Sequence, residues 1–325
     1  MIVSPRILPT FVQQDGRLLS SEYDVELIAM SGLASIGRLK SAVRNAGALF
    51  LWFLGRHAIP AILFAHLRRI PVVAVIGGFE VAWEEDIQYG IQPGSARDRL
   101  LGWMLRQMRA IVTVSRFSHN LAVGRFPTLS DRMILIHNAV DESVFSPSPT
   151  ASRSGVLCVA TLSADSIKVK NLGLYRQLAI ATPGTSFTLV GPAIDSEAKR
   201  YVSSLPKNVQ WMGQLSDDSL VDAYRKASVY FLASHHESFS LALAEAMSCG
   251  CIPVISPNGA LPEVGGADAR IVQNLSIESC QEAIADGLTA TEVERIRVRE
   301  HIAKNFGTKL RRAGLSRLFA KILHP

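Results

Sequence analysis

Two carboxylates eight residues apart, Glu237 and Glu245, are the side chains of this chain best suited to chemistry. Glu237 follows the apolar run VYFLAS and lies just before a turn of small residues. Glu245 falls about two turns into the helix expected after that turn, for which Ser238 or Ser240 is the expected cap. The two carboxylates therefore bracket the start of a helix and do not form an adjacent acid/base pair.

The start of this helix is a candidate anion site. The first backbone N–H groups of a helix have no partner within it, so those of Phe239, Ser240 and Leu241 are expected to point outward, as a diphosphate requires. Glu237 and Glu245 could then accept hydrogen bonds from sugar hydroxyls on either side of the diphosphate. The alternative is an amphipathic helix whose Glu245 faces solvent.

Short apolar runs must position these residues. Seven runs are rich in β-branched residues and are separated by helical or loop segments, a pattern typical of parallel strands buried on both faces. These runs are PVVAVIG, AIVTVS, MILIH, GVLCVAT, SFTLVG, VYFLAS and CIPVIS. A chain of 325 residues suffices for two domains. The Ser/Pro-rich stretch SPSPTASRSG, residues 146–155, is interpreted as the linker between them. Ligands of open α/β sheets bind at the carboxyl ends of the strands, so we expect a cleft there.

Charge and composition restrict the classes of binding partner that we expect. The net charge is +6, the sequence pI is about 9.3 and aromatics make up 7% of the residues. The basic residues are scattered and no nucleic-acid motif accompanies them, so an anionic lipid headgroup is the preferred partner and nucleic acid is not expected. Arg56, Arg68 and Arg69 interrupt the apolar segment 46–78, which predicts a buried helix followed by the strand PVVAVIG instead of a membrane span. Without a secretory signal pattern, the expected location is cytoplasmic, at the inner face of the membrane.

Metal chemistry is not expected. The four cysteines lack the spacing of a disulfide framework and are expected to be reduced. A zinc site of Cys249 and Cys251 with His235 and His236 is disfavoured, because structural zinc motifs usually space their Cys ligands two to four residues apart. The chain also lacks the D-x-D triplet that bridges a divalent cation to a diphosphate, the G-x-G-x-x-G fingerprint and the P-loop.

The segment from His235 to Gly266, with its E-x7-E spacing followed by EAMSCG and CIPVISP, resembles the donor-site block of the retaining family 4 glycosyltransferases. Four other segments resemble segments of that family and occur in the same order, so the resemblance covers nearly the whole chain. They are AIVTVSRFSHNLA, ILIHNAVDESVFSP, FTLVGPA and VQWMGQLSDDSLVDAYRKASVYFLASHHESF. It implies the two-domain B-type fold (GT-B), an α/β fold with two Rossmann-like domains facing a cleft. Residues 1–147 are then the acceptor-binding domain, residues 148–305 the nucleotide-sugar-binding domain, and residues 306–325 a helix crossing back to the first domain.

The resemblance also implies an activity. Members of that family move a sugar from a nucleoside diphosphate to a hydroxyl acceptor with retention of configuration. We therefore expect a hexosyltransferase-type enzyme without metal or cofactor that acts on a sugar or lipid-linked acceptor in glycan or glycolipid assembly.

Residue roles follow from the same resemblance. Glu237 contacts the donor sugar and Glu245 the ribose hydroxyls. Lys170 is the expected cation on the diphosphate, and Lys168, in the same loop, is the second choice. Thr161 stands where the family carries an Arg, which is a departure from its pattern.

Other positions leave two interpretations open. Gly191, Gly213 and Leu215 line the nucleotide base and diphosphate, or belong to simple turns. On the acceptor side the family often has a His where this chain has Glu80, two residues after Gly78. Glu80 is either placed to meet an acceptor hydroxyl or belongs to a solvated acidic face.

Ser115 and Asn138 line the cleft or hinge, or act in capping and turns. Two rival functions remain, a nucleotide-sugar epimerase of similar fold and a catalytically weak nucleotide-sugar-binding partner protein. Thr161 and Glu80 are the departures that keep the second rival open.

Overall fold

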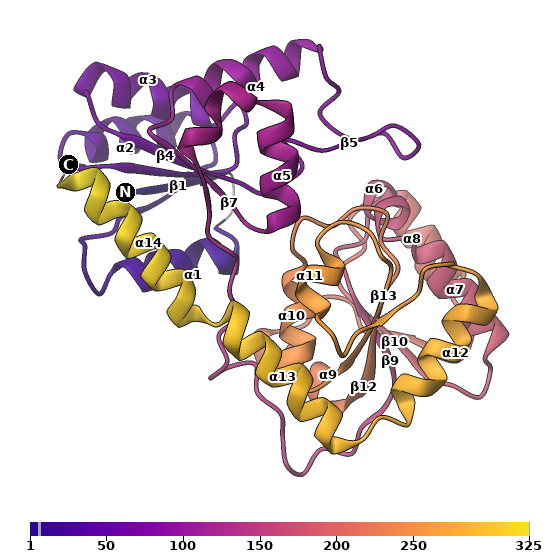
Figure 1. Cartoon of the computed structure of the whole chain (residues 1–325). Coiled ribbons are helices and arrows are strands. Elements are labelled where there is room, and N and C mark those ends of the chain that lie inside the picture. The colour runs from indigo at the N-terminus through magenta and orange to yellow at the C-terminus, as the bar shows by residue number, and fades with distance from the viewer. Residues whose placement is uncertain (6–7, 325) are drawn as a thin grey trace. The chain divides into compact units, whose positions relative to one another are not determined.

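The computed structural model describes residues 1–5 and 8–324, which form two compact units (Figure 1). Unit 1 consists of Met1–Ala139 together with Thr308–Pro325, and unit 2 of Val140–Gly307. The chain passes between the units at 139/140 and 307/308, whereas the sequence placed these passages at 147/148 and 305/306. Each unit contains its own six-stranded sheet.

Unit 1 is built on a parallel sheet with the strand order β2-β1-β3-β4-β7-β8. Its strands are β1 (Ile2–Pro5), β2 (Leu27–Met30), β3 (Leu49–Trp52), β4 (Val72–Ile76), β7 (Ala110–Thr113) and β8 (Met133–Leu135). Its helices are α1 (Thr10–Leu19), α2 (Leu33–Val43), α3 (Ala58–Arg68), α4 (Ala96–Arg106), α5 (Arg116–Arg125), the 3-10 helix η1 (Pro127–Arg132) and α14 (Thr308–Leu323). A small antiparallel hairpin, β5 (Trp83–Glu84) and β6 (Tyr89–Gly90), follows β4.

The apolar segment 46–78 contains an element that the sequence did not predict. The expected buried helix is α3 and the expected strand is β4, but strand β3 precedes them. All residues of β3 and β4 are buried, because these neighbouring strands are covered on both faces. Among the described residues, no helix is both long and apolar enough to cross a membrane.

A buried ion pair joins the two chain segments of unit 1. The guanidinium of Arg311 on α14 donates to both carboxylate oxygens of Asp15 on α1, with Nη2 2.7 Å from Oδ2. Both side chains are almost fully buried, at 1% and 0% exposure. Trp52 Nε1 donates to the same carboxylate at 3.0 Å, and Arg311 Nη1 donates to the carbonyl of His137 at 2.7 Å. The last helix is thereby fastened to α1 and to the end of β3 within unit 1.

Unit 2 has a second parallel sheet with the order β11-β10-β9-β12-β13-β14. Its strands are β9 (Ser154–Val159), β10 (Phe187–Val190), β11 (Val209–Trp211), β12 (Ala227–Leu232), β13 (Ile252–Ile255) and β14 (Arg270–Ile271). Its helices are α6 (Ala164–Val169), α7 (Leu172–Ala181), α8 (Ser196–Ser203), α9 (Asp217–Lys226), α10 (Leu241–Ser248), α11 (Leu261–Gly265), α12 (Ile277–Leu288) and α13 (Glu292–Phe306). In Figure 1, α7 and α12 pack together on one side of this sheet, and α10 and α13 on the other.

The stretch 146–155 is not a free linker. Arg225 Nε donates to the carbonyl of Ser146 at 2.8 Å, and Arg153 Nη1 donates to the carbonyl of Ala227 at 3.0 Å. Residues 154 and 155 already belong to β9. The interpretation as a linker is therefore wrong: the Ser/Pro composition shows where regular structure stops, but long-range hydrogen bonds attach this stretch to unit 2.

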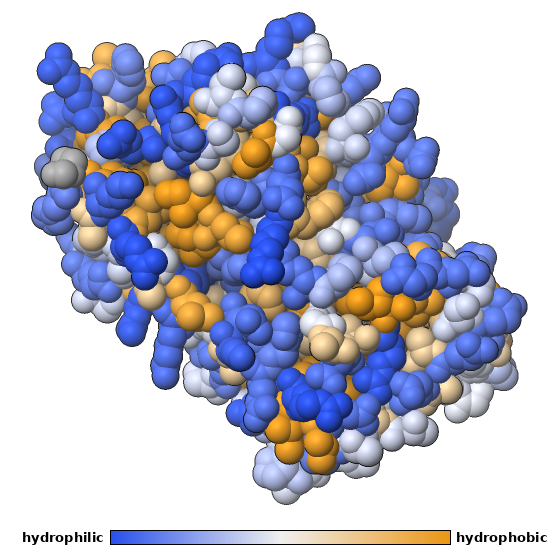
Figure 2. Space-filling view, in the orientation of Figure 1, coloured by the Kyte–Doolittle hydropathy of each residue, from blue (hydrophilic) through white to orange (hydrophobic). Residues whose placement is uncertain are grey.

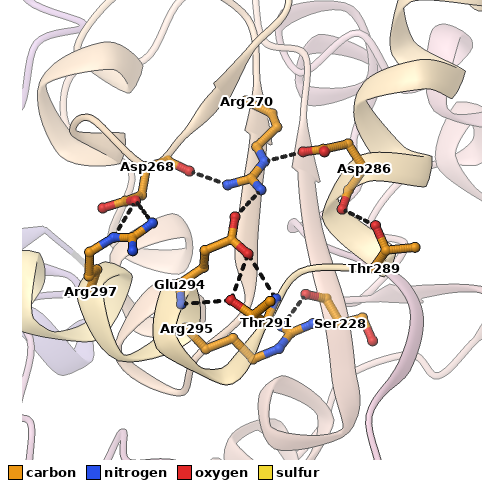
Figure 3. A network of polar contacts seen from close by, with 9 residues as sticks. All are labelled: Ser228, Asp268, Arg270, Asp286, Thr289, Thr291, Glu294, Arg295 and Arg297. Carbon is orange, nitrogen blue, oxygen red and sulfur yellow. Dashed lines mark hydrogen bonds and ion pairs between the residues drawn. The ribbon is translucent and has the colours of Figure 1, made fainter.

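A polar network fixes the start of α13 (Figure 3). Thr291 caps the helix in a capping box with Glu294, and Arg270 on β14 bonds to both Glu294 and Asp286 at 2.6 Å. The buried Arg295 donates to the carbonyl of Ser228 at 2.9 Å. Backbone donation and the Arg270 partner lower the pKa of Glu294 to about 2.

Hydrophilic residues dominate the face drawn in Figure 2, where hydrophobic residues gather in separate patches. Among the most exposed large apolar side chains are Leu67 and Leu63 on α3, at 77% and 50% exposure.

Candidate functional site

The candidate site residues of unit 2 gather at one edge of its sheet. Because its strands are parallel, the loops that follow them lie at the same edge, which is where α/β sheets bind ligands. Loops after five different strands carry them: Thr161 after β9, Gly191 after β10, Gly213 and Leu215 after β11, Glu237 after β12, and Gly259 after β13.

Lys170 and Glu237 form an ion pair at this edge. Lys170 Nζ lies 2.6 Å from Glu237 Oε1, and Ser234 Oγ donates to the same oxygen at 3.2 Å. The side chains are 22% and 13% exposed, so water still reaches the pair. Burial by itself lowers the pKa of Lys170, but the carboxylate of Glu237 outweighs it and the net shift is upward. The site therefore holds a fixed positive charge beside a carboxylate.

Local structure brings Lys170 to this position. The sequence predicted a lengthened loop, whereas the structure has the short helix α6, opened by a capping box between Ser163 and Ser166. Lys170 directly follows its last residue, and Lys168, the second choice, is exposed on α6. His235 N donates to the carbonyl of Val169 at 2.8 Å and ties the Glu237 loop to the end of α6. A contact across 67 residues is thus fixed by backbone as well as by charge.

The loop after β13 supports Glu237 from the other side. Ala260 N donates to the carbonyl of Glu237 at 2.8 Å, and Asn258 Nδ2 donates to the carbonyl of Ser234 at 3.0 Å. Gly259 has φ +64°, and a Cβ there would lie 2.4 Å from the carbonyl oxygen of Glu237. Only glycine fits this close approach. No site role was predicted for these residues from the sequence, although the Asn-Gly pair is a turn signal.

Helix α10 begins at Leu241, as the anion-site hypothesis requires, but the expected serine cap is not formed. Ser240 is the N-cap residue, yet it is left-handed at φ 71° and its side chain makes no cap hydrogen bond. The first N–H groups of α10 are therefore left to other partners. The ring of Phe239 is buried and packs edge-on against Phe306, so only the backbone of Phe239 is offered to a ligand.

Glu245 does not face solvent freely, so the amphipathic alternative is wrong for this residue. It is partly buried on α10, and the hydroxyl of Tyr224 donates to its Oε2 at 2.9 Å. Burial raises the pKa of Glu245 to about 7. The carboxyl group is thus held by one phenol and titrates near neutral pH.

The glycine positions differ in what the fold demands of them. Gly191 has φ +131°, and a Cβ there would lie 1.8 Å from the carbonyl oxygen of Ala160. Its N–H donates to the carbonyl of Gly213 at 2.8 Å, so close packing between neighbouring strand ends already requires it. Gly213 is also left-handed, but open space surrounds its Cβ position. Thr161 is exposed and brings no charge to the edge.

In unit 1, the carboxylate of Glu80 points into the protein. The side chain is 4% exposed, and its two oxygens accept hydrogen bonds from the N–H groups of Leu54 and Gly78, each at 3.2 Å. Burial raises its pKa. The expectation that Glu80 meets an acceptor hydroxyl, and its alternative of a solvated face, are both corrected, because two backbone donors hold this carboxyl inside. Gly78 is itself buried and left-handed at φ 112°.

Ser115 and Asn138 follow β7 and β8, respectively. Ser115 is buried and forms a capping box with Ser118 at the start of α5, which is the capping role left open by the sequence. Asn138 is partly buried, and its Oδ1 is a buried atom with no hydrogen-bond partner among the described residues.

Within the described part of the chain, no three His, Cys, Asp or Glu side chains come together as a group that could hold a metal ion. Cys249 and Cys251 are buried free thiols, and the Cys251 thiol donates to the carbonyl of Tyr224 at 3.0 Å. Burial raises the pKa of each thiol to about 12. They have the features of core residues.

Residues 171–305, which lie within unit 2, match the family model described as "Glycosyl transferases group 1". The chain is 25% identical over 176 residues to the phosphatidylinositol N-acetylglucosaminyltransferase gpi3 subunit of Schizosaccharomyces pombe, covering 51% of this chain and 38% of the relative. It is 27% identical over 183 residues to the MMP alpha-(1->4)-mannosyltransferase of Mycolicibacterium hassiacum, covering 53% and 44%. The matches thus span less than half the length of these curated relatives.

Solved structures show the same fold over almost the whole chain. Anabaena HepE, solved in complex with UDP and glucose, superposes with a TM-score of 0.80 at 13% identity and covers 98% of this chain and 99% of its own. Sucrose-phosphate synthase from Thermosynechococcus elongatus gives 0.77 at 14% identity, covering 99% and 98%. With its two parallel sheets, the chain has the GT-B type of two-domain α/β fold, as the sequence predicted.

Proposed function

We propose that this protein is a retaining glycosyltransferase that moves a sugar from a nucleoside diphosphate to a hydroxyl acceptor in glycan or glycolipid assembly. The observation that carries the proposal is the Lys170–Glu237 ion pair at the carboxyl edge of the unit 2 sheet, in the unit that contains the match to the group 1 family model. Phe239, Ser240 and Leu241 supply backbone N–H groups near this pair, at the start of α10.

Each group has a role in the proposed reaction. As the bond between the sugar and the diphosphate breaks, negative charge develops on the leaving phosphate, and Lys170 stabilises it together with the first N–H groups of α10. Glu237 keeps Lys170 charged and accepts hydrogen bonds from the donor sugar. Glu245 binds the ribose hydroxyls, and Gly191, Gly213 and Leu215 line the nucleotide.

No protein base is assigned to the acceptor. In a retaining transfer the leaving phosphate oxygen can take the acceptor proton, so the geometry of a two-carboxylate glycosidase is not required. The burial of Glu80 agrees with this mechanism, because its carboxylate is occupied by backbone donors. We propose that the reaction needs no divalent metal.

The names of the relatives support the acceptor class. Three are subunits of phosphatidylinositol N-acetylglucosaminyltransferases, whose name specifies a lipid acceptor, and one is a mannosyltransferase. The net charge of +6 suits an anionic surface. We therefore propose a sugar or lipid-linked acceptor and peripheral contact with an anionic membrane at its cytoplasmic face.

Thermal unfolding with a panel of nucleotide sugars tests the donor assignment. A ligand that binds only the folded protein at 100 times its Kd stabilises it by about 2.7 kcal/mol. We expect one nucleotide class to raise the Tm, in the presence of chelator as well as without it. The configuration of the transferred sugar then tests retention, and loss of turnover on chelation with recovery on Mn²⁺ or Mg²⁺ would contradict the metal-independent mechanism.

A catalytically weak nucleotide-sugar-binding partner is the second candidate. The exposed Thr161 favours it, because a neutral side chain stands at the position where the resemblance implies an Arg. Binding of a nucleotide sugar without transfer to any acceptor, together with rescue of transfer by Thr161→Arg, would favour this candidate over the enzyme.

A further inference from the structure

Unit 1 carries a row of arginines along the edge where its strands begin. The connections that lead into β3, β4, β7 and β8 all bring arginine to this edge, and these four strands are neighbours in the parallel sheet. Parallel strands begin at one edge, so the arginines lie side by side along it. We call them the arginine edge: Arg44, Arg68, Arg69, Arg106, Arg109 and Arg132.

Hydrogen bonds connect neighbouring members of the arginine edge. Arg68 Nη2 donates to the carbonyl of Arg44 at 3.4 Å. Arg132 Nη1 donates to the carbonyl of Arg106 at 3.1 Å and to that of Met108 at 3.2 Å. These contacts hold guanidinium groups against the ends of the preceding connections, and they use only part of the donors on each side chain.

Three of these arginines line one hollow. Arg69, Arg109 and Arg132 surround a space of about 340 Å³ together with Gln107, and the other lining residues are apolar. An adjoining hollow shares Arg69 and Gln107 and adds His66. Neither hollow has an acidic lining residue.

Among the described residues of unit 1, no carboxylate forms an ion pair with the arginines that line this hollow. Residues 27–79 and 99–130 contain no Asp or Glu, and Asp131 is the sole acid next to a member of the arginine edge in sequence. Other arginines of the unit have carboxylate partners, as Arg125 has with Asp98 at 2.8 Å. In the described part of the chain, the guanidinium groups of Arg69 and Arg109 have no hydrogen-bond or ion-pair partner.

We propose that this hollow binds a phosphate group. Guanidinium is planar and presents paired N–H donors that match two phosphate oxygens, and three such groups around one space neutralise a phosphate without a competing carboxylate. The phosphate belongs either to an anionic lipid headgroup or to a free phosphorylated molecule. Leu63 and Leu67 on α3, next to Arg68 and Arg69, offer exposed apolar contact and favour the lipid.

This inference rests on the proposed function only for the contact with an anionic membrane, whose place it assigns to the arginine edge. It is independent of the donor site, because the residues assigned to the nucleotide sugar all lie in unit 2. Nucleotide-sugar binding is therefore a separate readout that tells failure of one proposal from failure of the other.

The test compares two double variants of the full chain. R69Q/R109Q removes two guanidinium groups from the hollow that bond to nothing else in the described chain. R97Q/R312Q is the matched control: it makes the same charge change at two exposed residues of unit 1 outside the arginine edge. Wild type and both double variants are assayed by co-sedimentation with vesicles of phosphatidylglycerol and phosphatidylcholine and with vesicles of phosphatidylcholine alone. The same three proteins are titrated with inorganic phosphate.

We expect wild type to bind the anionic vesicles and not the neutral ones. R69Q/R109Q should bind the anionic vesicles at least about tenfold more weakly than wild type, whereas the affinity of R97Q/R312Q should stay within about twofold of wild type. Binding of inorganic phosphate that is lost in R69Q/R109Q, without vesicle binding, supports the site and identifies a free phosphorylated ligand. Equal loss in both double variants would show that overall charge is responsible, and would overturn the proposal. Absence of both vesicle and phosphate binding in wild type, with an intact nucleotide-sugar response, overturns this site alone.

Discussion

Replacing Lys170 with Ala removes the charge at the centre of the candidate donor site and leaves Glu237 without its partner. Loss of one member of a fully buried ion pair costs about 3–5 kcal/mol. Here the two side chains are 22% and 13% exposed, so water screens part of the remaining charge and we expect a loss of about 1–3 kcal/mol in the free energy of unfolding of unit 2. Lys168→Ala is the matched control, because Lys168 is exposed on α6.

The double variant Lys170→Ala/Glu237→Gln separates the pair from the rest of the site. Neutralising the carboxylate removes the unpaired charge, so this variant should be more stable than Lys170→Ala alone, with a coupling energy of about 1–2 kcal/mol. Urea unfolding followed by circular dichroism, fitted with separate transitions for the two units, measures the effect. Wild type, Lys170→Ala, Glu237→Gln and the double variant form the cycle that gives this coupling energy. The same four proteins are then titrated with the nucleotide sugar found by the panel.

Stability and binding are expected to respond differently in this series. Glu237→Gln restores stability to the Lys170→Ala background but not affinity for the diphosphate, because the cation is still absent. Full nucleotide affinity and turnover in Lys170→Ala, with loss in Lys168→Ala, would refute the assignment of Lys170. A coupling energy of zero would show that the ion pair does not act as a unit.

Three further predictions concern stability. Arg311→Ala should lower the free energy of unfolding of unit 1 by about 3–5 kcal/mol in urea, because it leaves a buried carboxylate unpaired, while the exposed Arg312→Ala should change it by less than about 0.5 kcal/mol. The pKa of Glu245 is raised to about 7 from an ordinary value of 4.5, so the unfolded chain loses this proton at a lower pH than the folded chain. The free energy of unfolding should therefore fall as pH rises from about 4.5 through 7, by at most about 3 kcal/mol. A Glu245→Gln variant that keeps the same slope would refute this. The pKa of Glu294 is lowered to about 2, so its contribution is present above about 4.5 and is lost as pH falls toward 2; Glu294→Gln should abolish that dependence in acid titrations followed by circular dichroism.

The sequence by itself determined the class of fold and the segment that carries the donor-site residues. Continuous β-branched runs separated by helical segments predicted parallel strands, and those runs became β4, β7, β8, β9, β10, β12 and β13. The small-residue turn after VYFLAS predicted the start of α10. These are local signals, because hydrophobic periodicity and helix starts depend on neighbours within a few residues.

Short strands with little sequence signal were missed. β1, β2, β11 and β14 have between two and four residues each. β3 was absorbed into a predicted apolar helix, because a short apolar run does not distinguish a buried strand from a buried helix. Its partners β1 and β4 decide the outcome, and they are contributed by other parts of the chain.

Only the tertiary structure decided where individual charged side chains point. Asp15 and Arg311 meet across 296 residues, and Lys170 meets Glu237 across 67. Glu80 follows a Gly-Gly turn that is typical of an open loop, yet its carboxylate is buried and accepts hydrogen bonds from the N–H groups of Leu54 and Gly78. A buried charge persists only where partners compensate its lost hydration, and those partners come from strands whose order in the sheet is set by the packing of the whole unit.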